Sequence, residues 1–300
     1  MTEHLLAFVE RSLRRPVPDF VRAVAAELAR AQGVRAVLFY GSNLRTGSAE
    51  GVLDFYVLHD GPIERGIWPR VGYAEFPRGG VTLRAKIARM NLSTFARAAA
   101  GRLLDTTVWA RFVQPTALVW SADAKAAADA VDAVADAAVS AARFAAALGP
   151  ERGRADDYWR SLFRATYSAE FRVEKRGRGD EIVDHDPERY AQLLPLAWAA
   201  GGIAFRCDAG LVAPALPPAE RARLRRRWTR RRRAGTPLNI VRLVKAASTF
   251  EGAARYGAWK IERHTGVPVT LTPWRERHPV LAAPGVLWSV WRRQARSTSK

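Results

Sequence analysis

A glycine-serine pair and an aspartate mark the segment of this sequence with the clearest chemical potential. Gly41 and Ser42 end one apolar run, and eleven residues separate Ser42 from Asp54 in the next apolar run. Glycine lets backbone N–H groups approach a phosphate closely, and the serine hydroxyl can bond the same group. A carboxylate on the neighbouring strand can hold Mg²⁺ against those phosphates. The spacing therefore predicts a site for a triphosphate and a metal ion.

The same pattern is found in nucleotidyltransferases, where a second carboxylate usually follows the first by two residues, so that both leave one face of the strand. Tyr56 occupies that position here. A second anionic ligand must then come from elsewhere, and the candidates are Asp60, Glu75 and Glu170. An ordinary turn followed by a strand-end carboxylate would give the same pattern, so both interpretations stay open at this point.

The elements that must position these residues can be read from the apolar spacing. Residues 34–40 and 52–58 are rich in β-branched and aromatic side chains, which predicts two buried strands. Further strands are expected at 82–90, 117–120 and 266–271. Helical spacing predicts helices over 19–31, 92–104, 123–148, 156–174, 187–200, 219–233 and 238–254.

Gly149-Pro150 is a strong stop signal after the long Ala-rich helix. The sequence predicts two domains that meet there. Residues 1–150 form an α/β domain with a mixed sheet and flanking helices, and residues 151–300 form a smaller, mostly helical and strongly basic domain.

The two strand motifs resemble those of the mitochondrial-type phosphatidate cytidylyltransferases, the translocator assembly and maintenance proteins. Tyr40-Gly41-Ser42 is similar to that family's Tyr-Gly-Ser-Gly, and Leu53-Asp54-Phe55 is similar to its Leu-Asp-Phe. The family has an apolar residue after this motif, so Tyr56 follows the family's pattern. Asn43 departs from it, because the family has a second glycine there.

The resemblance continues in order to about residue 266. Asp60 falls where the family has an aspartate just after the second strand, and Lys86 falls at its strand lysine. Arg111 with Pro115 resembles a Gly-Arg-Leu-x-Lys-Pro segment, with Ala110 and Gln114 as departures. Residues 166–172 resemble Ser-Tyr-Ser-Gly-Asp-Phe-Arg, and they include Glu170 and Arg172. Arg242 and Lys260 lie in a stretch that resembles the C-terminal part of the family more loosely.

This resemblance implies a nucleotidyltransferase fold followed by a winged-helix-like domain. The implied reaction converts CTP and phosphatidate to CDP-diacylglycerol and pyrophosphate, with Mg²⁺ as cofactor. Asp54 would bind the metal together with Asp60 or Glu170. Lys86 and Arg172 would neutralise charge on the triphosphate. Gly41, Ser42, Arg111 and Lys260 would contact the nucleotide.

The charge balance favours an anionic partner. Lys and Arg outnumber Asp and Glu by 19, and most of the excess lies in residues 151–300. Nine arginines fall within residues 221–233, where Leu224 and Trp228 would place a small apolar stripe on a helix. An anionic lipid surface, nucleic-acid phosphates and a solvated linker each suit that run, and lipid is favoured over nucleic acid. Residues 286–293 carry Trp288 and Trp291 beside two arginines, which suits either an interfacial anchor or packing against the core.

No apolar stretch is long enough for a membrane span. The single cysteine, Cys207, excludes an internal disulfide and suits a reducing compartment. The five histidines are scattered without metal-ligand spacing. We therefore expect a cytoplasmic protein, peripheral on the inner face of the cell membrane.

Two other function classes remain open from the sequence. The first is a nucleotidyltransferase that acts on a soluble acceptor, such as a drug, a protein or an RNA end. The second is a degenerate nucleotidyltransferase that only binds RNA or another acidic partner, which Tyr56 makes possible. Base preference and acyl-chain preference follow from contacts that no spacing reveals.

Overall fold

The computed structural model describes residues 1–66, 69–169, 178–249, 252–277, 281–286, 288–289 and 292. Its centre is a five-stranded mixed sheet in the order β3-β4-β2-β1-β5, in which β2 and β4 are parallel and the other neighbours are antiparallel. The strands are β1 (Val34–Tyr40), β2 (Leu53–His59), β3 (Arg70–Arg78), β4 (Val81–Asn91) and β5 (Thr116–Ser121). The sequence prediction missed β3, whose glycine and charged residues interrupt the apolar run.

Each face of the sheet has its own apolar layer, because alternate strand residues point to opposite faces. One layer joins Phe39, Phe55 and Ile87 to helix α2 (Asp19–Leu28). The other layer joins Leu38, Tyr56 and Ala88 to helices that include α1 (Glu3–Leu13), α4 (Leu92–Ala99), α5 (Thr107–Phe112) and α6 (Ala124–Leu148). The predicted helix over 92–104 stops early, since Gly101 adopts a positive φ of 63°.

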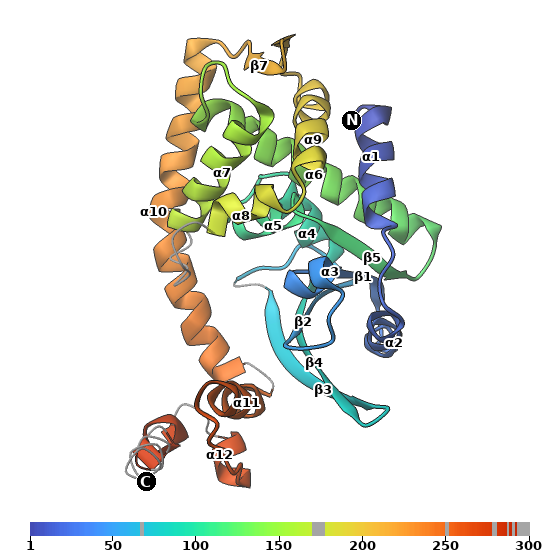
Figure 1. The fold of residues 1–300 in the computed structure, drawn as a ribbon, viewed down its shortest axis with the longest axis vertical. Coiled ribbons are helices and arrows are strands. Elements are labelled where there is room, and N and C mark those ends of the chain that lie inside the picture. The colour runs from blue at the N-terminus through green and yellow to red at the C-terminus, as the bar shows by residue number, and fades with distance from the viewer. Residues whose placement is uncertain are drawn as a thin grey trace.

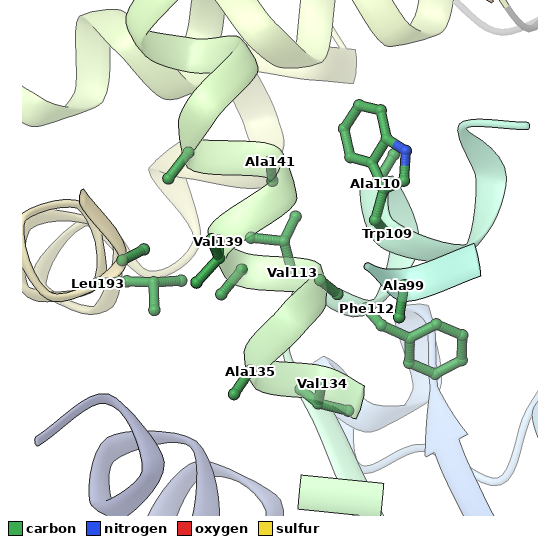
Figure 2. Close-up of a cluster of buried hydrophobic side chains, with 14 of the residues drawn as sticks. Ala99, Trp109, Ala110, Phe112, Val113, Val134, Ala135, Val139, Ala141 and Leu193 are labelled. Carbon is green, nitrogen blue, oxygen red and sulfur yellow. The ribbon is translucent and has the colours of Figure 1, made fainter. Parts of the chain in front are cut away.

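Helix α6 is the centre of the larger apolar layer. Its alanines allow close packing on several sides, and fifteen of its residues are buried. Figure 2 shows Trp109 and Phe112 on one side of α6 and Leu193 on the other. This layer includes residues on both sides of Gly149-Pro150, so the two predicted domains share one core. The boundary itself stays a prediction.

The second half of the chain is mostly helical, as predicted. It contains α7 (Ala155–Ala169), α8 (Arg178–Asp184), α9 (Pro187–Ala200), α10 (Pro218–Thr249), α11 (Ala253–Thr265) and α12 (Pro273–Arg277). A hairpin of β6 (Phe205–Asp208) and β7 (Leu211–Pro214) lies between α9 and α10. Two predictions are corrected here: 178–181 are helical rather than a turn, and 267–271 form no strand.

Helix α10 runs along one side of the molecule, from the β7 end to α11 (Figure 1). The two helices predicted on either side of Gly235-Thr236-Pro237 are one continuous element. A Cβ at position 235 would lie 2.3 Å from the carbonyl oxygen of Ala169, so the glycine permits close contact with α7. No helix among the described residues has the length and apolar character to span a membrane.

Candidate active site

Two of the predicted site residues lie side by side on the sheet. Asp54 pairs with Tyr40 of β1 on one side and with Lys86 of β4 on the other. Directly opposed residues of neighbouring strands share a face, so Asp54 and Lys86 leave the sheet together. Tyr73 of β3 continues the row beyond Lys86. The β-sheet register therefore brings a carboxylate and an ammonium group, 32 positions apart in the sequence, to one place.

Gly41 follows Tyr40, the β1 member of this row, at the end of the strand. Its φ of 92° and ψ of −164° form a backbone conformation that side-chain-bearing residues rarely adopt. A Cβ at this position would lie 2.7 Å from Oδ2 of Asp54. Glycine is needed here for two separate reasons, the backbone angle and the contact with the carboxylate.

Asn43 stabilises the loop after Gly41-Ser42. Its side chain is buried, and Nδ2 donates to the carbonyl oxygens of Ser48 at 2.9 Å and Glu50 at 2.7 Å. Ser42 begins the short helix α3 (Ser42–Thr46), and its hydroxyl lies 3.4 Å from Oδ1 of Asn43. Asn43 therefore has a structural role, which is to fold residues 43–50 back toward β2.

Burial and charge act in opposite directions on Asp54. Burial raises the pKa of its carboxyl group, because the charged form loses hydration. The positive charges of Lys86 and Arg111 lower that pKa in turn. Arg111, from α5, places its guanidinium 5.4 Å from the ring centroid of Tyr40. Asp54, Lys86 and Arg111, which the sequence predicted for one site, are thus close enough to interact electrostatically.

Tyr56 fills the position of the usual second carboxylate with an aromatic ring. It lies on the same face as Asp54 and is 1% exposed. Its ring contacts those of Tyr40, Phe95 and Phe112, with centroids 5.0 to 6.1 Å away. Its hydroxyl lies 3.5 Å from Nη1 of Arg111. The Tyr56 hydroxyl is thus within reach of Arg111 and offers no anionic ligand, since burial raises its pKa.

Asp105 and Arg242 form a second charged pair near Tyr56 that sequence reasoning missed. The Asp105 carboxylate is buried, accepts a hydrogen bond from Thr107, and pairs with Arg242 of α10 at 2.8 Å. Both charges act on the Tyr56 hydroxyl. The sequence offers no signal for this pairing, because the two residues come from a loop and from a distant helix.

Helix α11 approaches the same site from the C-terminal part of the chain. The charge of Asp54 contributes to the raised pKa of Tyr256, after the larger effect of burial. The Tyr256 ring lies 5.4 Å from that of Tyr73, and Lys260 lies 6.0 Å from the Tyr256 ring centroid. Gly252 permits this approach, since a Cβ there would lie 2.5 Å from the Tyr73 carbonyl oxygen. Lys260 is therefore near the predicted site, and Tyr256 is a site residue that sequence reasoning missed.

Two of the three candidate extra carboxylates lie elsewhere. Asp60 follows the far end of β2, six positions and about 20 Å of strand from Asp54. Glu75 accepts a hydrogen bond from Tyr73 and lies 3.6 Å from Arg84. Glu170 and Arg172 lie outside the described residues. In the described part of the chain, no three His, Cys, Asp or Glu side chains gather as metal ligands. Asp60 and Glu75 therefore do not lie on the sheet row of Asp54. A single carboxylate together with substrate phosphates is the smallest ligand set that holds Mg²⁺.

The arginine run of residues 221–233 is helical, which corrects the linker interpretation. Leu224 and Trp228 face the core, where Trp228 contacts Trp109 and Phe144, so this apolar stripe is not available to lipid. Arg231 is also buried and donates to the carbonyl oxygens of Gly101 and Leu103. The outward face carries the exposed side chains of Arg223, Arg226, Arg227, Arg230, Arg232 and Arg233.

A scan against protein-family models and a search of curated proteins found no match to this chain. Among solved structures, the chain is similar to a nucleotidyltransferase-like protein from Exiguobacterium sibiricum 255-15. The identity is 12%, the match covers 93% of this chain and 90% of the other, and the TM-score is 0.25. At that TM-score the superposition is no guide to function, and a proposal for this chain must rest on the residues around Asp54.

Proposed function

We propose that this protein is a nucleotidyltransferase that transfers a nucleotidyl group from a nucleoside triphosphate to an acceptor oxygen. The observation that carries the proposal is the position of the Asp54 carboxylate, where a Cβ at position 41 would lie, beside Lys86 in the same sheet row. This arrangement offers a glycine turn for phosphates, a carboxylate for a metal ion, and a cation for developing charge.

The reaction would proceed by displacement at the α-phosphorus. An oxygen of the acceptor forms the new P–O bond, and the bond to the β-phosphate oxygen breaks to release pyrophosphate. Lys86 and Arg111 would neutralise charge on the phosphates, and Ser42 would bond to one of their oxygens. Asp54 would hold Mg²⁺, whose contribution when bound is further charge neutralisation. Tyr56 would keep Arg111 in place.

As substrates we propose CTP and phosphatidate, which give CDP-diacylglycerol. Support comes from the motif resemblance at residues 40–42, 53–55 and 166–172. The cations near the site on separate elements, Lys86, Arg111 and Lys260, suit two phosphorylated substrates. Phosphatidate presents a phosphate at a membrane surface, so the proposal includes peripheral association with an anionic membrane.

The exposed arginines of α10 are the surface that best suits such an association. Within the described residues, Arg226, Arg227, Arg230, Arg232 and Arg233 pair with no carboxylate. Basic residues near an anionic membrane each contribute about 1 kcal/mol of attraction. The C-terminal part of the chain also exposes large apolar side chains, which are Ile240, Val241, Trp274, Leu281 and Trp288.

Transfer of label from α-³²P-CTP to a chloroform-soluble product tests the proposal. Purified protein would be assayed with phosphatidate in mixed micelles and Mg²⁺, next to the D54N variant. We expect a labelled lipid that is lost in the variant. If no lipid is labelled over a range of detergents and metal ions, phosphatidate is not the acceptor. Other nucleotides and soluble acceptors, including RNA ends, would then be screened.

One observation favours a second candidate, a protein that binds a nucleotide or RNA without transfer. The second carboxylate position is occupied by Tyr56, which is buried in an aromatic cluster. A protein of this kind would release no pyrophosphate from any triphosphate. D54N would then leave its affinity for the anionic partner unchanged or higher, because the variant removes a negative charge.

A further inference from the structure

Helix α11 carries two aromatic and two basic side chains along one face. These are Tyr256, Trp259, Lys260 and Arg263, whose spacing of i, i+3, i+4 and i+7 makes them neighbours on an α-helix. The rings of Tyr256 and Trp259 are half-buried, and their centroids lie 6.2 Å apart. Nζ of Lys260 lies 6.0 Å from the Tyr256 ring centroid. This face therefore combines flat aromatic rings with positive charge.

The aromatic part of this face contacts strands β3 and β4. The ring centroid of Tyr256 lies 5.4 Å from that of Tyr73 on β3. The Arg84 guanidinium on β4 lies 5.3 Å from the ring centroid of Trp259. Tyr73 and Arg84 leave the sheet on the same side as Asp54, because Tyr73 belongs to the Asp54 row and Arg84 precedes the lysine of that row by two positions. Figure 1 shows α11 beside β3.

The basic part of the face reaches the segment that leads into β2. A Cβ at Gly51, two positions before β2 begins, would lie 3.4 Å from Nη1 of Arg263. Helix α11 therefore lies near both the β3 end of the Asp54 row and the chain just before Asp54. Adjacent strands are about 4.8 Å apart, so Tyr73 lies about 10 Å from Asp54. Lys86, between them in the row, is exposed, so a ligand can reach this part of the sheet.

The two rings of α11 lie among basic groups and outside the apolar core. In the described part of the chain, neither apolar layer of the sheet includes Tyr256 or Trp259. The Trp259 ring instead has the guanidinium groups of Arg84 and Arg263 each 5.3 Å from its centroid. Aromatic faces bordered by basic side chains are typical of surfaces that stack nucleobases and attract their phosphates.

We propose that Tyr256 and Trp259 form the surface on which the base of the nucleoside triphosphate stacks. This inference rests on the proposed function, in which the triphosphate binds between Gly41 and Lys86. The row continues from Lys86 through β3 to α11, so a triphosphate bound at its first part directs the base toward these rings. Stacking uses the π-face that every base has, so this surface favours nucleoside triphosphates as a class over polyphosphates without a base.

Calorimetry of the full chain with Mg²⁺ would compare CTP with inorganic triphosphate, which has the phosphates and no base. Y256L keeps an apolar side chain and removes the aromatic ring. We expect this variant to bind CTP about tenfold more weakly, the loss of one stacking contact, and to bind inorganic triphosphate as the wild type does. Y256F keeps the ring and should retain CTP affinity. F205L removes a half-buried ring in the β6–β7 hairpin and is the matched control, with both affinities unchanged.

W259L keeps the proposal testable if Y256L does not fold, and we expect the same selective loss of CTP affinity. The proposal is overturned if the folded variants bind CTP as tightly as the wild type does. It is also overturned if they lose affinity for CTP and inorganic triphosphate equally, because the rings would then act only on the fold or on the phosphates. Label transfer tests the proposed function separately: a selective loss of CTP affinity in a protein that transfers no label would reject nucleotidyl transfer and support the stacking surface.

Discussion

The Asp105 carboxylate and the Arg242 guanidinium, 137 positions apart, form an ion pair of 2.8 Å that joins the loop before α5 to helix α10. Asp105 is 7% exposed, so removal of Arg242 would leave a buried charge without its partner. We expect R242M to lower the free energy of unfolding by about 3 kcal/mol, as for other buried ion pairs. Urea denaturation would measure this loss.

A double-mutant cycle distinguishes this pair from general damage. D105N with R242M should show a coupling of about 2 kcal/mol between the two changes. The exposed pair Glu10–Arg14 is the control, and its coupling should stay below about 1 kcal/mol. Equal couplings for the two pairs would contradict a buried interaction.

Gly41 can be tested by adding a single methyl group. G41A introduces both a strained φ and a contact with the Asp54 carboxylate. We expect a loss of about 2 kcal/mol or more in stability, together with loss of nucleotidyl transfer. Position 47 is the matched control, because Gly47 also has a positive φ of 67°, whereas a Cβ added there would meet no atom within 4 Å.

G47A should therefore cost only the backbone strain, about 1 kcal/mol, and keep its activity. Urea denaturation and the CTP assay on both variants would show the difference. If G47A and G41A lose stability and activity equally, the contact with Asp54 has no role.

Asp54 should matter for activity and not for stability. The conversion of its carboxylate to an amide removes a charge whose burial is unfavourable, as the raised pKa of this group indicates. D54N should lower kcat/KM about 100-fold or more while the urea midpoint stays unchanged or rises. D129N, at a partly exposed carboxylate paired with Lys125, should retain activity. A D54N variant with unimpaired turnover would exclude a catalytic role for this residue.

Trp228 and Arg227 lie next to each other on α10 but face opposite environments. Trp228 is 6% exposed and packs on Phe144, whereas Arg227 is exposed. W228A should lower the free energy of unfolding by about 3 to 5 kcal/mol. R227A should change it by less than about 0.5 kcal/mol. Similar losses in the two variants would contradict the orientation of α10.

The same helix allows a test of membrane association. R226E with R230E reverses two exposed charges that have no described acidic partner, so stability should be retained. Sedimentation with anionic liposomes should fall at least about tenfold, since each basic residue contributes about 1 kcal/mol. An RNA competitor belongs in the assay. If RNA, but not liposomes, binds in a manner that depends on these arginines, the anionic partner is a nucleic acid.

His59 predicts a pH dependence of stability. Burial lowers the pKa of its imidazole, and its Nε2 has no hydrogen-bond partner among the described residues. The unfolded chain, with a histidine pKa of about 6.5, then binds the proton more readily than the folded one. Stability should be fully present above about pH 6.5 and decrease as the pH falls toward the folded-state pKa.

Urea midpoints between pH 5 and 8 would measure this dependence. H59Q should flatten the pH dependence relative to the wild type. H4Q, which changes an exposed histidine, should leave it unaltered. A wild-type slope that H59Q does not change would assign the effect to other groups.

Local patterns in the sequence determined much of this protein. Apolar runs predicted β1, β2, β4 and β5, and the nearly continuous runs of β1 and β2 fit strands that lie between two apolar layers and are apolar on both faces. The stop signal at Gly149-Pro150 predicted the end of α6, and helical spacing predicted a helix over about 187–200, where α9 lies. The spacing of Gly41, Ser42 and Asp54 predicted a phosphate-type site, since adjacent strands bring their ends together.

The tertiary structure decided what local patterns cannot specify. The order β3-β4-β2-β1-β5 places Lys86 beside Asp54, and the long α10 brings Tyr256 and Lys260 to the same region. Leu224 and Trp228 face the core because α6 offers an apolar surface there, although the sequence suits lipid equally well. Each of these contacts depends on the packing of segments that are distant in the chain. The spacing of residues along the sequence does not specify such packing.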